Sequence, residues 1–141
     1  MSKTNILIVE DESIVAKDIQ HSLKKLGYTV VGMCSTGEDA IKTAEETKPD
    51  LVLMDIMLKG DMSGIEAAGQ IREKFNIPII YLTAYADEST LSKAKVSEPY
   101  GYIIKPSKEI DLHTSIEMSI YKHEKETDVK KNPADEGATS P

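Results

Sequence analysis

The most constraining feature of the sequence is a regular alternation of short apolar runs with segments whose apolar residues recur at helical spacing. The runs occupy residues 6–9, 28–33, 51–54, 78–82 and 101–104. Continuous apolar runs of this length are typical of strands buried on both faces. A helix after each strand favours parallel pairing. The sequence therefore predicts an α/β fold, with a parallel sheet of five strands and helices on both of its faces.

The helices are predicted from apolar spacing and from end signals. Residues 13–26 form one apolar stripe, and Gly27 is placed to end that helix at the C′ position. A second helix is predicted between an N-cap at residues 35–37 and Pro49. Residues 65–75 predict a third helix, and residues 87–96 predict a short, weak one. The last helix is expected to begin near Ser107.

Composition limits the partners of this chain. Its formal net charge is −7, which argues against direct nucleic-acid binding because phosphate backbones would be repelled. Its single cysteine allows no intramolecular disulfide. No apolar stretch is long enough for a signal peptide or a membrane span. We therefore expect a cytoplasmic protein without a membrane partner.

The composition changes after residue 122. Val129 is the only large apolar residue between positions 123 and 141, and the segment is otherwise polar and charged. Such a segment buries too little apolar surface to order itself. We predict a domain over residues 1–122 and a disordered or frayed tail over residues 123–141, with no output domain after it.

Polar residues that could bind a ligand or take part in a reaction follow four of the apolar runs. Glu10 and Asp11 follow the first run, Asp55 the third, Thr83 the fourth and Lys105 the fifth. Ligands bind beyond the carboxyl ends of strands in open α/β sheets, so these groups are expected on one rim. Carboxylates about 4 Å apart repel each other by roughly 4 kcal/mol at an effective dielectric near 20, so the cluster needs a cation.

Oxygen ligands of this kind suit Mg²⁺. A divalent cation, an ammonium group and a hydroxyl donor are together the equipment for phosphoryl transfer. A carboxylate can itself be the nucleophile, which would give an aspartyl phosphate. The residues therefore predict a phosphoryl-transfer site.

The motifs around these residues resemble the receiver-domain family of two-component response regulators, in its stand-alone, CheY-like form. The matching segments are residues 6–12, 53–57, 63–65, 81–84 and 101–106, in the family's order and spacing. The resemblance covers roughly residues 3–122. It implies a flavodoxin-like, doubly wound (βα)5 fold with strand order 2-1-3-4-5.

The resemblance also implies roles for individual residues. Asp55 would accept a phosphoryl group from a sensor histidine kinase or a phosphotransfer protein. Glu10, Asp11 and Asp55 would hold Mg²⁺ together with the backbone carbonyl of Met57. The chain would be a phosphorylation-regulated switch and not an enzyme, with only self-phosphorylation and self-dephosphorylation chemistry.

The switch is implied in the same way. Thr83 would hydrogen-bond one phosphoryl oxygen, Lys105 would neutralise another, and Tyr102 would turn inward as Thr83 moves. The Lys105–Pro106 bond would be cis. The surface of the fourth helix, fifth strand and fifth helix would change for a downstream protein or for a second copy of the chain.

Three positions depart from the family pattern. Lys59 stands where a proline is usual, and Gly64 lies one residue farther from Asp55 than usual. Glu10 replaces a common aspartate. Met57 and Tyr85 occupy positions that tune dephosphorylation in the family.

Other interpretations fit single residues better than the whole set. Thr83 alone could be a helix cap, Lys105 a solvated charge and Tyr102 a core aromatic. An Asp-nucleophile phosphatase would usually carry a second aspartate where Met57 stands. Flavin binding would need a phosphate loop in place of the acidic residues 10–12. A receiver that docks without being phosphorylated is the remaining alternative.

Overall fold

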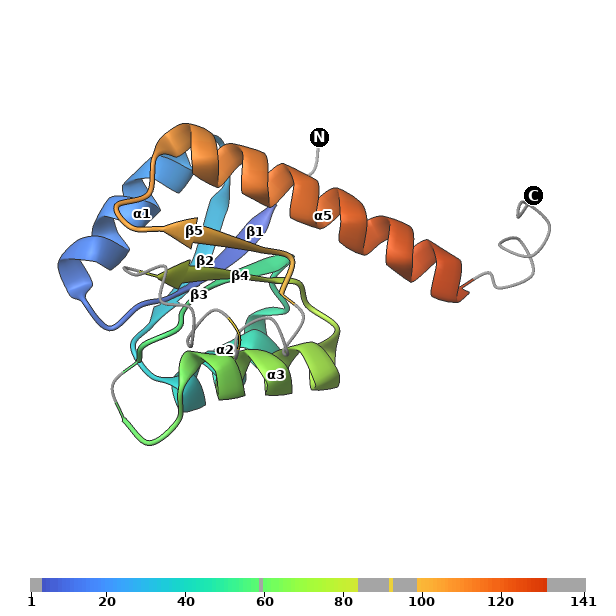
Figure 1. The fold of residues 1–141 in the computed structure, drawn as a ribbon, viewed down its shortest axis with the longest axis horizontal. Helices are drawn as coiled ribbons and strands as arrows, with labels where there is room; N and C mark the ends of the chain where they lie inside the picture. Colours follow the sequence, from blue (N-terminus) through green and yellow to red (C-terminus); the bar gives the residue numbers. More distant parts are fainter. Residues whose placement is uncertain (1–3, 59, 84–91, 93–98, 132–141) are drawn as a thin grey trace.

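The computed structural model describes residues 4–58, 60–83, 92 and 99–131. A parallel sheet runs through its centre in the order β2-β1-β3-β4-β5, so the predicted topology is confirmed (Figure 1). The strands are β1 (Asn5–Val9), β2 (Thr29–Cys34), β3 (Leu51–Asp55), β4 (Ile79–Thr83) and β5 (Gly101–Ile104). Each lies within one residue of its predicted limits, because the apolar runs are the buried strands themselves.

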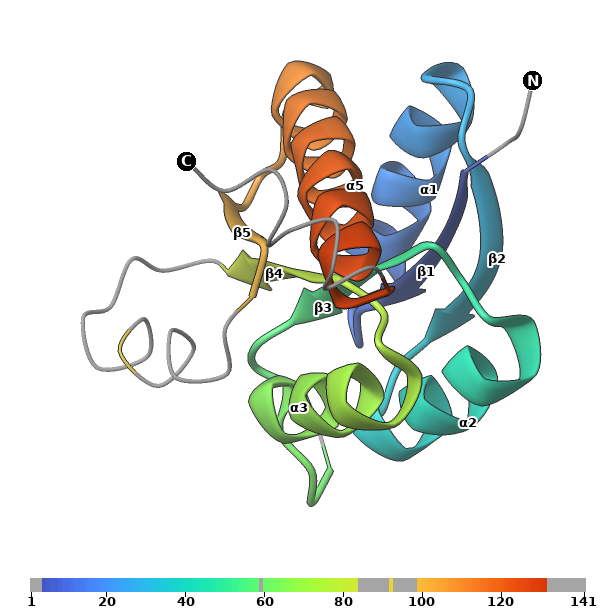
Figure 2. The same ribbon diagram turned by 90° about the vertical axis from the view of Figure 1, so that its right-hand side faces the viewer.

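Helices cover both faces of the sheet. They are α1 (Ser13–Lys25), α2 (Gly37–Thr47), α3 (Gly64–Phe75) and α5 (Glu109–Lys131). Figure 2 shows α1 and α5 on one face and α2 and α3 on the other. The helix predicted over residues 87–96 lies outside the described residues, apart from Ser92.

Burial separates the central strands from the edges. Every residue of β3 and β4 is buried, and so are the last four residues of β1. The edge strands β2 and β5 are mostly half-buried. Two apolar clusters, one on each face, form the core. The sheet is therefore held rigidly on both sides where β1 and β3 end.

The helix ends follow the predicted signals. Gly27 has a φ of 94°, which a glycine adopts without steric cost, and it follows α1 as expected. The Thr36 side chain accepts a hydrogen bond from the Asp39 amide at the start of α2. Ser63 does the same for the Glu66 amide at the start of α3. These caps satisfy amides that have no partner inside the helix.

The last helix is longer than expected. It begins at Glu109 and continues to Lys131, so the expectation of a disordered or frayed tail is wrong for residues 123–131. Residues 132–141 lie outside the described part of the chain. Tyr100 contacts this continuation, because its hydroxyl donates to Glu126 and its ring lies edge to face with the His123 ring, with the two centroids 5.9 Å apart. Among the described residues, no helix is both long and apolar enough to cross a membrane.

Candidate functional site

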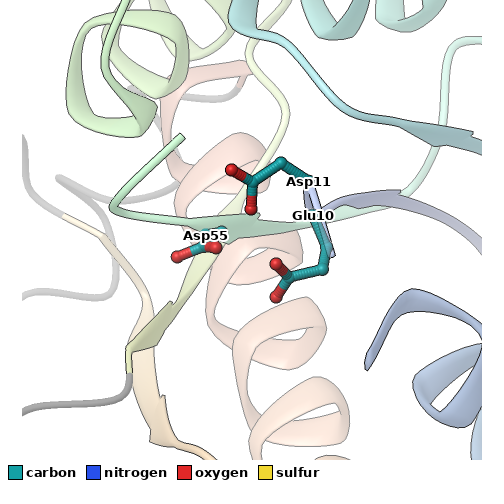
Figure 3. A group of neighbouring side chains, drawn as sticks. All are labelled: Glu10, Asp11 and Asp55. Atoms are coloured by element: carbon teal, nitrogen blue, oxygen red, sulfur yellow. The ribbon is translucent and has the colours of Figure 1, made fainter. Parts of the chain in front are cut away.

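The carboxyl-terminal ends of β1 and β3 bring three acidic side chains together. Glu10, Asp11 and Asp55 each offer a carboxylate oxygen within 4.8 Å of the others, and Figure 3 shows the three groups gathered beyond the strands. Glu10 is 3% exposed and Asp55 is 4% exposed, whereas Asp11 is half-buried. The predicted convergence is therefore confirmed.

The sheet sets the positions of these carboxylates. Asp55 is the last residue of β3 and lies beside Leu82 of β4, while Val9 at the end of β1 lies beside Met54. The Glu10 amide donates to the Cys34 carbonyl at 2.9 Å, which continues the β1–β2 pairing past the strand. Buried neighbouring strands thus carry the acidic residues to one point.

Lys105 supplies the positive charge of the site. Its ammonium Nζ lies 3.1 Å from Asp55 Oδ2 and also contacts Glu10 Oε1. Burial lowers the pKa of Lys105, but hydrogen bonds and charge attraction from Glu10 and Asp55 outweigh it, so the pKa is raised overall. The Lys105–Pro106 peptide bond is cis, as expected.

The donor set of the site fits a divalent cation. Glu10 and Asp55 are almost completely buried beside the half-buried Asp11, and the Lys105 ammonium contacts both Glu10 and Asp55. Close carboxylates repel in a partly buried position, and a hard divalent cation with oxygen ligands offsets that repulsion. Glu10, Asp11 and Asp55 could hold such an ion while leaving room for other ligands.

The loop after Asp55 begins with a backbone contact to the carboxylate. The Met57 amide donates to Asp55 Oδ1 at 3.1 Å, while the Met57 side chain is 68% exposed. Gly64 lies at the other end of this loop, and its amide donates to the Ile56 carbonyl at 3.1 Å. A Cβ at Gly64 would lie 1.9 Å from the Asp55 carbonyl oxygen, so only glycine fits there. Lys59 lies outside the described residues.

The predicted switch residues occupy two adjacent strands. Thr83 is 2% exposed at the end of β4, and its carbonyl accepts the Lys105 amide at 2.8 Å. Tyr102 is half-buried on β5, and its ring lies 6.2 Å from that of Tyr81. Tyr85 lies outside the described residues. Thr83 therefore lies beside Ile104 of β5, and Tyr102 lies beside Tyr81 of β4.

Comparison with known proteins identifies the family. Residues 6–117 match the model of the response regulator receiver domain, which is most of the chain. This chain belongs to that family. As a receiver domain it has the five-stranded sheet of CheY-like structures. One from Methanospirillum hungatei JF-1 superposes with a TM-score of 0.79 at 28% identity, covering 89% of this receiver and 99% of that chain.

Other relatives place the receiver domain in larger proteins. The transcriptional regulatory protein PdtaR of Mycobacterium tuberculosis is 36% identical over 82% of this chain and 56% of its own length. The signal receiver domain of a modulated diguanylate cyclase from Desulfovibrio desulfuricans G20 is 40% identical, with a TM-score of 0.85, covering 89% of this chain and 99% of that domain. The receiver spans about half the length of the curated relatives that it matches.

Two features of the site were missed from the sequence. Lys105 contacts Glu10 as well as Asp55, and the Glu12 amide donates to Glu10 Oε2 at 3.1 Å. The first contact joins the ends of β1 and β5, which are not neighbours in the sheet. Only the side-chain reach of Lys105 across β4 and β3 could have suggested it.

Proposed function

We propose that this receiver domain takes a phosphoryl group onto Asp55 and uses the modified state as a signal. The observation that supports this most is the buried Asp55 carboxylate, clustered with Glu10 and Asp11 and held by Lys105 at 3.1 Å. A fixed carboxylate with a cation on one side and room for a metal on the other is arranged for nucleophilic attack.

The donor would be a phosphohistidine on a sensor kinase or a phosphotransfer protein, as family membership implies. An oxygen of the Asp55 carboxylate attacks the phosphorus atom, and an O–P bond forms as the N–P bond breaks. The released imidazole nitrogen takes a proton from water. The product is an aspartyl phosphate, which places a doubly charged group where one carboxylate charge stood.

Mg²⁺ would be held by Glu10, Asp11, Asp55 and the Met57 carbonyl, and it would neutralise charge on the phosphoryl oxygens. Lys105 moves its ammonium from the Asp55 carboxylate to a phosphoryl oxygen, since both positions lie within reach of one side chain. The Thr83 hydroxyl donates to another phosphoryl oxygen. These residues position and stabilise charge, which is most of the catalysis in phosphoryl transfer.

The signal would leave the site through Thr83 and Tyr102 toward β5 and α5. Several apolar side chains on these two elements are more than half exposed, which supports binding of a protein partner or of a second copy of the chain. They are Ile104, Ile110, Met118 and Tyr121. The chain would therefore act as a switch in the cytoplasm and not as an enzyme with a metabolic substrate, and its downstream partner would be a protein.

Intact mass after incubation with acetyl phosphate and Mg²⁺ tests the proposal. One added phosphoryl group is expected in the wild type, and none in Asp55→Asn or in the presence of EDTA. If no mass is added, beryllofluoride binding followed by NMR distinguishes a short-lived adduct from an inert site. Failure of both would favour a receiver that docks without phosphorylation.

A further inference from the structure

The loop between β3 and α3 is fixed to the sheet at both of its ends. The Ile56 amide donates to the Leu82 carbonyl at 3.1 Å, and the Met57 amide donates to Asp55. At the far end, Gly64 donates to the Ile56 carbonyl and lies against the Asp55 backbone. Between these ends, Leu58 and Met62 pack against the core cluster on the α2–α3 face.

Met62 also contacts the start of α2. Its side chain is half-buried and packs against the core cluster on the α2–α3 face. A Cβ at Gly37 would lie 2.9 Å from Met62 Sδ and 3.0 Å from Met62 Cγ. The thioether therefore lies directly on the Gly37 backbone, a position that any side chain at residue 37 would occupy.

The surface under Met62 belongs to the same framework as the acidic cluster. Gly37 is buried and opens α2, whose N-cap is Thr36. Cys34 ends β2 just before this cap, and its carbonyl accepts the Glu10 amide at 2.9 Å. Contact between Met62 and Gly37 thus connects the loop that follows Asp55 to the backbone that positions Glu10.

We infer that Met62 is a positioning residue for the metal site and that it acts through its contact with Gly37. The inference rests on the proposed function, in which the Met57 carbonyl is one of the metal ligands. Met57 has an exposed side chain, so its own packing does little to fix its carbonyl. Leu58, next to Met57, packs against the core, and Met62 adds a second contact five positions after Met57.

The test is the affinity of the full chain for Mg²⁺, followed by amide chemical shifts and without any phosphoryl donor. Met62→Ala is expected to weaken Mg²⁺ binding by about tenfold, the lower end of what groups that orient metal ligands contribute. Met62→Leu, which keeps the volume, should restore most of the affinity. Faster hydrogen exchange at residues 56–58 and 60–63 should accompany the loss.

Two control variants separate positioning from general loosening. Met118→Ala removes a methionine that is 58% exposed on α5 and should leave the affinity unchanged. Ile71→Val removes one methylene group from the buried core on the α3 side of the sheet. It should lower thermal stability without changing the Mg²⁺ affinity. An equal loss of affinity in Ile71→Val, or no loss in Met62→Ala, overturns the inference.

Gly37→Ala gives an independent test from the other side of the contact. Its Cβ would meet Met62 Sδ at 2.9 Å and Ala67 Cβ at 3.1 Å, so it should weaken Mg²⁺ binding on its own. The part of this loss that comes from displacing Met62 should disappear in the Met62→Ala background. Fully additive effects would overturn the inference. If the wild type binds no Mg²⁺ and Asp11→Asn changes nothing, both the proposed function and this inference fail. If the wild type binds Mg²⁺ and Met62→Ala binds it equally well, only this inference fails.

Discussion

The carboxyl-terminal edge of the sheet and the second half of α5 use polar side chains in opposite ways. At the edge, Glu10 and Asp55 are almost completely buried and share one ammonium group. Along α5, the hydroxyl of the half-buried Tyr100 donates to Glu126 near the surface. The first region gathers three carboxylates at one point, while the second pairs one hydroxyl with one carboxylate. The capacity to bind a cation therefore lies where the fold brings several carboxylates together.

Removing the ammonium group at the edge should have the largest effect on stability. Lys105→Met is expected to lower the free energy of unfolding at neutral pH by about 3–5 kcal/mol, because it leaves buried carboxylates without their partner. Chemical denaturation measures the change. Lys125→Met, which removes a cation over the Tyr121 ring on α5, should change stability by less than about 1 kcal/mol. Equal effects of the two variants would show that the cation at the sheet edge matters no more than the cation on α5.

The contribution of Lys105 should also depend on pH in a defined direction. Its pKa is raised in the folded protein, so its contribution is fully present below the unfolded-state value of about 10.4. The contribution should be lost as the pH rises through the higher folded-state value. The stability difference between the wild type and Lys105→Met should therefore shrink above that range. A difference that stays constant there would contradict the assignment.

Mg²⁺ should stabilise the protein through the edge alone. At 100 times its Kd, the ion is expected to add about 2.7 kcal/mol to the free energy of unfolding. Asp11→Asn should remove most of this gain, while Tyr100→Phe should leave it intact. Thermal unfolding with and without Mg²⁺ measures both. A gain that persists in Asp11→Asn would place the ion elsewhere.

The sequence predicted most of this edge because its residues end apolar runs. Asp55 and Thr83 end parallel strands and Lys105 directly follows one, so their positions follow from strand direction alone. The Glu10–Lys105 contact could not be predicted in the same way, because it joins strands that are not adjacent. The details of the loop between β3 and α3 depend on packing across the chain, which no local pattern encodes.

The continuation of α5 escaped prediction for a different reason. Residues 123–131 have little apolar periodicity, so the sequence favoured disorder there. The contacts that hold this part of the helix come from Tyr100, which is 26 positions away from Glu126. Polar contacts between distant residues leave no repeating pattern in the sequence. Such contacts determine the structure where little apolar surface is buried.

Two glycines of α3 differ in how closely other atoms pack against them. Gly64→Ala at the edge is expected to lower stability by about 1–3 kcal/mol, because the new Cβ would overlap the Asp55 carbonyl. Gly69→Ala within α3 meets no atom within 4 Å and should raise stability by about 0.5–1 kcal/mol. Denaturant midpoints distinguish the two signs. A neutral Gly64→Ala would show that the edge can relax.

The smallest effect is expected on α5. Tyr100→Phe removes one hydrogen-bond donor and should lower stability by about 1 kcal/mol, with faster amide exchange between residues 120 and 131. Tyr121→Phe is the matched control, since that ring is 62% exposed. Exchange that is equally fast in both variants would mean that Tyr100 does not hold the helix.

The close approach of Gly64 to Asp55 has a consequence for protein engineering. The two ends of the segment 56–63 lie side by side, since the Gly64 amide donates to the Ile56 carbonyl at 3.1 Å. The segment between them is therefore a closed excursion, and its length can change without moving either end. Loops exchanged between receiver domains should be joined at this glycine, which would keep Asp55 in place while the residues around it are changed.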